Sequence, residues 1–291
     1  MNTESLEIFC WVASELSITQ AAARLGRAPS NVTTRIQQLE AELGAELFVR
    51  TNKRMALTSA GEQFVGYARR FLALEEEARH VVSGGREGGT LRIGSMESTA
   101  ASRLPALLAD YHERHSATRL TISTGPTRPL LEQVRTGQLD CAFVALSPLV
   151  GRSHNLLDDL GLAAVPAWRE ALKLLLPGGE EATDLAEIRV RRLAAFPQGC
   201  TYRGIAEEAL GIPAATDWQV SERSSYHAMI ASVAAGGCVT ILPDSVLRLS
   251  ALPTRLRTLD VGEIETALVA RQGFVVPAYA ALTELLHEHC R

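Results

Sequence analysis

One stretch near the N-terminus restricts the possible folds more than any other part of the chain. Ser17 and Gln20 have the spacing of a capping box, in which a serine oxygen and a glutamine side chain satisfy backbone amides at a helix start. We therefore predict a short helix over residues 18–25. Gly26 suits the left-handed position that ends such a helix, and Pro29 suits the first turn of the next one. Two short helices joined by a tight, glycine-containing turn form a helix-turn-helix.

Amphipathic segments flank this turn on both sides. The preceding segment has apolar residues at helical spacing: Leu6, Phe9, Ala13 and Leu16. The helix that opens near Pro29 has its own apolar stripe, formed by Val32, Ile36, Leu39 and Leu43. Its other faces are polar and rich in hydrogen-bond donors. Between Leu16 and Leu39 there is no Asp or Glu, whereas three arginines are present. An acid-free surface of this kind favours approach to the phosphates of a duplex.

A basic hairpin and a long helix are expected next. The segment LFVRTNKRMALT contains two short apolar runs around a basic tip, which indicates a β-hairpin and, with the helices before it, a winged helix. Ser59 and Glu62 have the spacing of a second capping box. Apolar residues then recur with alternating steps of three and four: Phe64, Tyr67, Phe71, Leu74, Ala78 and Val81. Because one helix cannot bury this stripe alone, pairing with a second chain is expected. Glycines in residues 83–89 indicate a joint.

From Leu91 the sequence alternates between strand-like and helical segments. The first series reads as a βαβαβ unit, which predicts a parallel sheet covered on both faces. A second series of the same kind follows, and a last strand and helix return the chain to the first series. The fold class expected is α/β.

Composition excludes several other classes. The apolar content of 46% is that of an ordinary globular chain, and a net charge of −4 argues against coating nucleic acid or membrane by bulk attraction. The five cysteines are widely spaced, and neither a signal peptide nor a membrane span is apparent, so a cytoplasmic protein is expected. Metal-binding spacings, phosphate-binding glycine loops and nucleophile elbows are missing, and we expect no enzyme, metal or cofactor.

The segment SITQAAARLGRAPSNVTTRIQQLEAELGAELFVRTNKRMALTSAGEQF resembles the DNA-binding region of LysR-type transcriptional regulators. The segments LRIG, TGQLDCAFV and GGCVTILP resemble the same family's effector domain. The resemblance implies a winged helix-turn-helix (1–58), a linker helix with a hinge (59–89) and a two-lobed effector domain (90–291) like periplasmic binding proteins. The first lobe would comprise about 90–161 and 266–291, and the second about 162–265. A homodimer through the linker helix, a homotetramer and contact with RNA polymerase are implied as well.

Candidate DNA contacts follow from the polar face and the resemblance. Residues expected to face the major groove are Ser30, Asn31, Thr34 and Arg35, because Arg pairs with guanine and Asn with adenine. Residues expected to touch phosphate are Thr33, Arg50, Lys53 and Arg54. Three further candidates are Arg27, Pro29 and Gln38. Many members of the family carry a serine-arginine pair where this chain has Thr33 and Thr34, so the operator sequence is left open.

Candidate effector contacts lie where helices begin after strands. Free amides at helix N-termini, with hydroxyl side chains beside them, form anion sites, and parallel sheets place ligands at the carboxyl ends of strands. We therefore expect a small carboxylate or similar anion between the lobes. The candidate residues are Ser98, Thr99, Thr127, Cys200, Thr201, Tyr202, Arg203, Ser224 and Ser225. For each serine or threonine, helix capping is the competing interpretation.

Three other functions stay open at this stage. One is a cytosolic binding protein or enzyme on a periplasmic-binding fold, which would bind ligand without sequence-specific DNA affinity. The second is a redox-sensing regulator acting through Cys200, although no second cysteine lies within the next 37 residues. The third is a nucleoid-type protein, against which the negative net charge argues.

Overall fold

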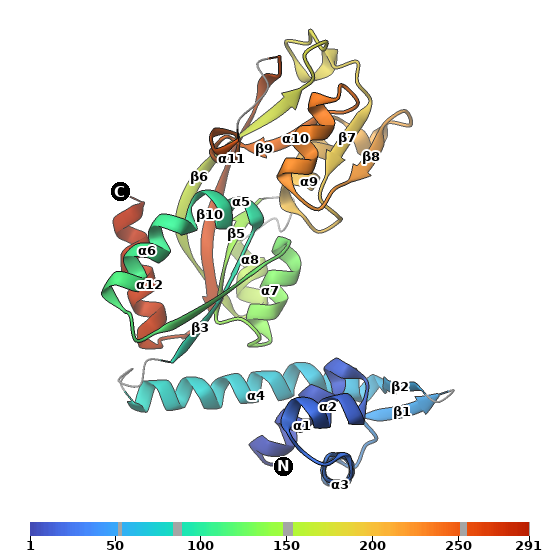
Figure 1. Ribbon diagram of the computed structural model, residues 1–291, viewed down its shortest axis with the longest axis vertical. Coiled ribbons are helices and arrows are strands. Elements are labelled where there is room, and N and C mark those ends of the chain that lie inside the picture. Colours follow the sequence, from blue (N-terminus) through green and yellow to red (C-terminus); the bar gives the residue numbers. More distant parts are fainter. Residues whose placement is uncertain (52–53, 84–88, 148–153, 251–254, 291) are drawn as a thin grey trace. The chain divides into compact units, whose positions relative to one another are not determined.

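The computed structural model describes residues 1–51, 54–83, 89–147, 154–250 and 255–290 (Figure 1). The chain divides into an N-terminal unit, Met1–Arg86, and a larger unit that holds nearly all of the remaining residues. The elements of the N-terminal unit are α1 (Thr3–Glu15), α2 (Ile18–Leu25), α3 (Pro29–Leu43), β1 (Phe48–Thr51), β2 (Arg54–Leu57) and α4 (Ser59–Ser83).

The helix-turn-helix forms where the local signals predict it. The Ser17 side chain accepts a hydrogen bond from the Gln20 amide at the start of α2, and Gly26 ends that helix with φ of 63°. Pro29 lies in the first turn of α3. Leu16 differs from the prediction: it caps α1 in a left-handed conformation, and its side chain is 45% exposed instead of joining the stripe.

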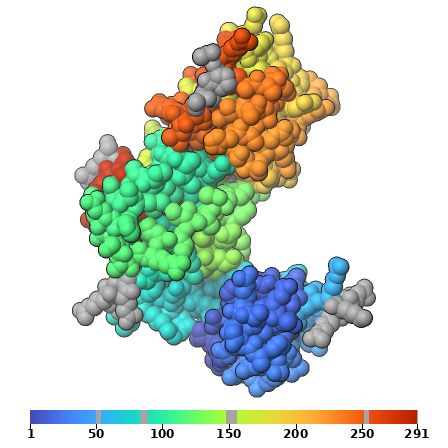
Figure 2. All heavy atoms as spheres, in the orientation of Figure 1, coloured from blue at the N-terminus to red at the C-terminus, as the bar shows by residue number. Residues whose placement is uncertain are grey.

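The wing and the start of α4 are also local structures. β1 and β2 pair antiparallel with Phe48 opposite Leu57, as a hairpin requires. At the start of α4 the expected Ser59 cap is wrong, because the Thr58 hydroxyl accepts the Gly61 amide instead. Around Phe9 the core of the unit includes an aromatic cluster with Phe48 and Phe64. The atoms of these first helices form one closely packed body in Figure 2 (blue).

The apolar stripe of α4 divides between two environments. Phe64 packs into the core of the N-terminal unit, its ring centroid 5.1 Å from that of Phe9. Tyr67, Phe71 and Leu74 are 67, 48 and 63% exposed, and Val81 is 48% exposed. An apolar strip of α4 from Tyr67 to Val81 is therefore exposed in the described part of the chain.

The larger unit is built on a six-stranded sheet with the order β4-β3-β5-β10-β6-β9. Its strands are β3 (Thr90–Ser95), β4 (Arg119–Thr124), β5 (Cys141–Leu146), β6 (Leu162–Leu176), β9 (Thr240–Pro243) and β10 (Arg257–Arg271). Its helices are α5 (Glu97–Ser102), α6 (Leu104–Arg114), α7 (Thr127–Arg135), α8 (His154–Asp159), α9 (Thr201–Ala209), α10 (Tyr226–Ala234), α11 (Asp244–Leu249) and α12 (Pro277–His289). A separate parallel pair joins β7 (Arg192–Ala195) to β8 (Gln219–Glu222), and the short 3-10 turns are Leu185–Glu187 and Ile212–Ala214.

Helices cover both faces of the β3-β4-β5 part of the sheet, as the sequence predicts. Successive residues of β5 point to opposite sides, since Phe143 packs with α6 and α12 whereas Val144 packs with α7. Figure 1 shows α6 and α12 (green and red) together on one side.

The parallel sheet predicted for the first series is confirmed for β3, β4 and β5, but the strands beyond β5 pair antiparallel. β3 pairs parallel with β4 and β5, but β10 pairs antiparallel with β5 and β6, and β6 pairs antiparallel with β9. β6 and β10 are fifteen residues each and serve two apolar cores. On β6 the change of core falls between Trp168 and Leu172, later than the lobe boundary expected at 161/162. Short apolar runs in sequence cannot reveal that one strand crosses between two cores.

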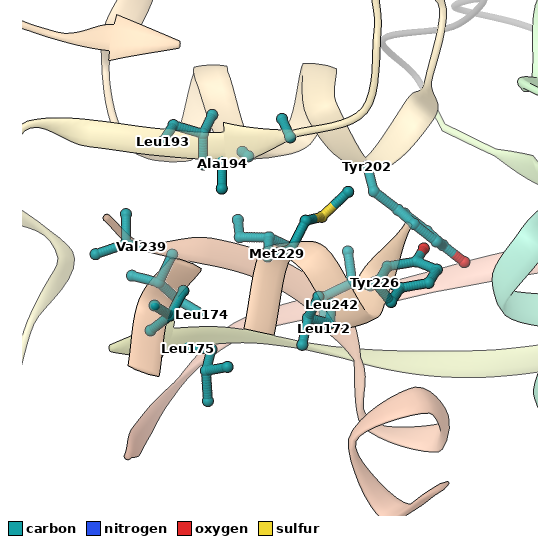
Figure 3. Close-up of a cluster of buried hydrophobic side chains, with 14 of the residues drawn as sticks. Leu172, Leu174, Leu175, Leu193, Ala194, Tyr202, Tyr226, Met229, Val239 and Leu242 are labelled. Atoms are coloured by element: carbon teal, nitrogen blue, oxygen red, sulfur yellow. The ribbon is translucent and has the colours of Figure 1, made fainter. Parts of the chain in front are cut away.

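The second core is formed largely by aliphatic side chains of β6, β7, β9, α9 and α10. Figure 3 shows that Tyr202 and Tyr226 lie side by side at one edge of this cluster, with both hydroxyl oxygens pointing away from the aliphatic side chains. The second core therefore carries a pair of phenol groups at its margin.

Candidate nucleic-acid interface and effector pocket

The polar face of α3 forms a single open groove. Its volume is about 430 Å³, and it is lined by Ser30, Asn31, Thr34, Arg35 and Gln38. These are residues that the sequence assigns to DNA. The apolar stripe of α3 packs inward, with Val32, Ile36 and Leu39 buried, so the polar side chains are forced outward. Pro29 and Arg27 are exposed beside the groove.

Two threonine hydroxyls of α3 donate hydrogen bonds to carbonyls of the helix itself. Thr33 Oγ1 donates to the Pro29 carbonyl and Thr34 Oγ1 donates to the Ser30 carbonyl, both at 3.0 Å. Each hydroxyl then offers only its lone pairs to solvent. Phosphate oxygens require donors, so the geometry disfavours the phosphate contact expected for Thr33.

The wing is described in part. Arg54 is exposed at the start of β2, and Arg50 lies in β1 opposite Met55. The Arg50 side chain and the whole of Lys53 lie outside the described residues.

Two arginines near the groove pair with a glutamate from a different helix, outside the acid-free segment between Leu16 and Leu39. Glu4, in the first turn of α1, accepts a hydrogen bond from Arg27, and its second oxygen lies 3.3 Å from Arg35 Nη2. The hydrogen bond with Arg27 and the charge of Arg35 lower the pKa of Glu4. The acid-free window in sequence is therefore not acid-free in space.

The larger unit contains a cavity of about 290 Å³ at the end of several strands. Its walls are mainly apolar and aromatic, with hydroxyl groups among them. The lining residues are Met96, Glu97, Thr124, Gly125, Pro126, Thr127, Phe196, Pro197, Cys200, Thr201, Tyr202, Ser224 and Tyr226. A volume of this size suits a small molecule.

Three nine-residue helices begin at this cavity, namely α7, α9 and α10. The first residues of α7 and α9 are joined directly, because Thr201 Oγ1 donates to Thr127 Oγ1 at 2.8 Å and both residues are buried. Helix N-termini carry partial positive charge and free amides. The three helix starts therefore contribute partial positive charge to the cavity, whose lining includes no Arg, Lys or His side chain among the described residues.

Two buried hydroxyls at the cavity have no hydrogen-bond partner within the described protein, Ser98 Oγ and Tyr202 Oη. Their residues are 2 and 4% exposed. Burial raises the pKa of Tyr202, and the nearby Ser98 side chain opposes this shift, but the two hydroxyls do not form a hydrogen bond of ordinary geometry. An unpartnered buried hydroxyl costs about 1–3 kcal/mol, which a ligand's polar group would recover.

A carboxylate of the protein also faces the cavity. Burial raises the pKa of Glu97, while the Tyr226 backbone amide and the charge of His227 act in the opposite direction. Glu97 therefore lies near the start of α10, whereas the starts of α7 and α9 have no carboxylate of their own among the described residues of the cavity lining.

The sequence located part of this lining. Of the nine expected effector residues, Thr127, Cys200, Thr201, Tyr202 and Ser224 line the cavity. Thr99 and Ser98 are buried in α5 behind it, and Ser225 instead caps α10 by accepting the Ala228 amide. Arg203 is held by Glu207, Glu222 and the Phe196 carbonyl, so its guanidinium is used within the protein.

Sequence reasoning missed the walls of the cavity. Tyr226 directly follows the predicted Ser224 and Ser225, and Phe196 and Pro197 follow the end of β7. Because parallel sheets place ligands at the carboxyl ends of their strands, examining the residues after every predicted strand could have indicated them. Phe196 and Tyr226 contact each other edge to face, with ring centroids 5.0 Å apart.

Cys200 lacks the features of a redox sensor. Burial raises its pKa, despite the opposing effect of the backbone amides of Arg203 and Tyr202. A reactive cysteine needs its thiolate form, which a raised pKa disfavours. All five cysteines are free.

Two searches of the described residues gave negative results. They contain no cluster of three or more His, Cys, Asp or Glu side chains arranged to hold a metal ion. Nor does any described helix combine the length and apolar character needed to cross a bilayer.

Comparison with known proteins identifies the class. Residues 3–62 match the family model for a bacterial regulatory helix-turn-helix protein of the lysR family, and residues 84–291 match the LysR substrate binding domain. Together these define a helix-turn-helix transcription regulator with an effector-binding domain. The chain belongs to the family of LysR-type transcriptional regulators, and it is not an enzyme.

Individual relatives agree with this assignment. The chain is 36% identical over 249 residues to an uncharacterized HTH-type transcriptional regulator, YusT of Bacillus subtilis, covering 85% of this chain and 81% of the relative. It is 34% identical to YofA of Bacillus velezensis, covering 91% of each chain. Among solved structures, a full-length OxyR variant from Pseudomonas aeruginosa has a TM-score of 0.73 at 22% identity, over 99% of this chain and 95% of that one. CbnR, a LysR family regulator, gives 0.67 at 22% identity over both full chains.

Proposed function

We propose that the α3 groove is the sequence-reading surface of this regulator and that the pocket at the starts of α7, α9 and α10 binds its effector, in a cytoplasmic protein. The observation that carries the first part is the groove itself, which unites Asn31, Arg35 and Gln38 on the outward face of α3. Amide and guanidinium groups read base edges in the major groove. CbnR, a structural relative, has been solved in complex with its target DNA.

A matched pair of glutamines tests this interface. Gln37 and Gln38 are adjacent and both exposed, but only Gln38 lines the groove. We expect Gln38→Ala to weaken binding to DNA from the gene's own upstream region, measured by fluorescence anisotropy, while Gln37→Ala leaves it unchanged. Binding to scrambled DNA should be weaker for the wild type, and equal binding to both DNAs would contradict sequence-specific regulation and favour a binding protein without DNA specificity.

For the effector we propose a small molecule with an anionic group such as a carboxylate. The starts of α7 and α9, the Thr127 and Thr201 hydroxyls and the unpartnered hydroxyl of Tyr202 support an anion. The mainly apolar walls support a compact body attached to it. Calorimetry would compare the affinities of a panel of acids with those of their neutral amides, which have nearly the same shape but lack the charge. An amide that binds as tightly as its acid would refute an anionic effector.

Adjacent serines supply the matched variants for the pocket. Ser224 lines the cavity, whereas Ser225 caps α10. We expect Ser224→Ala to weaken effector binding at unchanged stability. Ser225→Ala should lower the free energy of unfolding by about 1 kcal/mol without changing the effector affinity. The reverse pattern would place the effector elsewhere.

We further propose that the exposed strip of α4 pairs with the same strip of a second copy, so that two α3 helices meet the halves of an imperfect palindrome. We also propose a tetramer formed through the larger units and contact with RNA polymerase, both of which rest on the resemblance to the family. Leu74 and Leu249 are 63 and 61% exposed, so they form a matched pair. We expect Leu74→Glu, but not Leu249→Glu, to halve the assembly size in analytical ultracentrifugation, and an unchanged size for Leu74→Glu would refute pairing through α4.

A further inference from the structure

Glu4 links three parts of the N-terminal unit through one carboxylate. It lies in α1, its first partner Arg27 lies in the turn before α3, and its second partner Arg35 lies in α3. The three side chains are 35, 34 and 37% exposed respectively. They are therefore accessible to a ligand while still being held in place.

The arrangement contributes little to folding. Solvent screens ion pairs between side chains that are this exposed. Its larger effect is on the charge and order of the groove. Arg35 lines the groove beside Asn31 and Gln38, and the contact with Glu4 limits the directions in which its guanidinium can point. Because a guanidinium has five N–H donors, most of them stay available for a base edge.

We propose that Glu4 is a positioning and specificity-determining residue, which orients Arg35 for base contact and discourages both arginines from binding phosphate indiscriminately. A pre-oriented Arg35 loses less side-chain freedom on meeting its base. Phosphate binding by Arg27 or Arg35 instead competes with the Glu4 carboxylate, which also repels the duplex backbone. The carboxylate thus lowers non-specific affinity more than operator affinity.

This inference rests on the proposed α3 interface, and the substitution Glu4→Gln tests it. Fluorescence anisotropy of the full chain would measure its affinity for two DNAs over a series of salt concentrations. The first is DNA from the gene's own upstream region, here called the operator DNA, and the second is scrambled DNA. Each arginine released to phosphate should steepen the slope of log K against log salt by about 0.9. With the affinity in 1 M salt unchanged, this slope raises the affinity at 0.15 M salt about fivefold. We therefore expect scrambled-DNA affinity to rise about fivefold or more, and the operator-to-scrambled ratio to fall.

Two further variants separate positioning from bulk charge. Glu7→Gln makes the same charge change on the same helix, at an exposed residue that forms no salt bridge in the described structure, and it should leave the ratio unchanged. Glu4→Asp keeps the charge and should restore much of the ratio. Equal effects of Glu4→Gln and Glu7→Gln would overturn the proposal. A wild type that does not distinguish operator from scrambled DNA would refute the α3 interface itself, and this inference with it.

Discussion

Replacing Tyr202 by Phe is expected to stabilise the protein without effector, although Tyr202 lies in the effector pocket. The Tyr202 hydroxyl is buried and has no hydrogen-bond partner among the described residues, so nothing there compensates for its loss of contact with water on folding. Mutational data place this cost at about 1–3 kcal/mol. Phe has nearly the same shape, so removing the oxygen should raise the free energy of unfolding by about 1 kcal/mol.

Tyr111 provides the matched control. It is also fully buried in the larger unit, but its hydroxyl donates to the Ala278 carbonyl at 3.0 Å. Tyr111→Phe loses this bond, so we expect a loss of about 1 kcal/mol. For a unit of this size, 1 kcal/mol shifts the melting temperature by about 2–4 °C, so the two variants should move in opposite directions in a thermal-unfolding assay.

Adding effector should reverse the advantage of Tyr202→Phe. An effector that hydrogen-bonds the hydroxyl binds wild type more tightly, and the stabilisation by ligand grows with [L]/Kd. The wild type should therefore gain more in melting temperature than Tyr202→Phe. If Tyr202→Phe is destabilised as Tyr111→Phe is, the hydroxyl has a partner in solution and the reasoning fails.

Three further predictions concern stability. Gly94→Ala should cost about 1–3 kcal/mol in chemical denaturation, because a Cβ there would lie 2.5 and 2.7 Å from two leucine methyl groups, and no loss would mean that the sheet can shift. Arg103→Ala should cost about 1–3 kcal/mol, since it leaves the 4% exposed Glu170 without its 2.6 Å partner, and Arg103→Lys should restore part of this. Burial acts to raise the pKa of Glu180, but hydrogen bonds from three backbone amides outweigh it, so the pKa is lowered in the folded state. The ionised Glu180 therefore stabilises the folded protein above its usual pKa of 4.5, and this contribution is lost as the pH falls through the lower folded-state pKa. Glu180→Gln should therefore lower stability at pH 7 and flatten the decline in stability toward acid, and a parallel pH profile would contradict this.

The fold of the N-terminal unit could be predicted because the sequence signals for it are local. Ser17, Gly26 and Pro29 determine helix ends through backbone conformation and capping within a few residues, and the structure places those ends as expected. The outward polar face of α3 follows from helical periodicity alone. Ser59 was misassigned because Thr58 and Ser59 can each cap the same helix start. Leu16 was misassigned because apolar spacing does not show at which residue the first helix ends.

Long-range geometry was decided by the tertiary structure. No local pattern indicates that β10 runs antiparallel between β5 and β6, or that Glu4 reaches Arg27 and Arg35 across the acid-free window. The sequence by itself determined the helix-turn-helix, the hairpin, the α/β alternation and the family, since these depend on neighbours along the chain. Only the tertiary structure decided which carboxylate pairs with Arg27 and Arg35 and which hydroxyls of the described residues stay unpartnered, because hydrogen bonds and charges act through space.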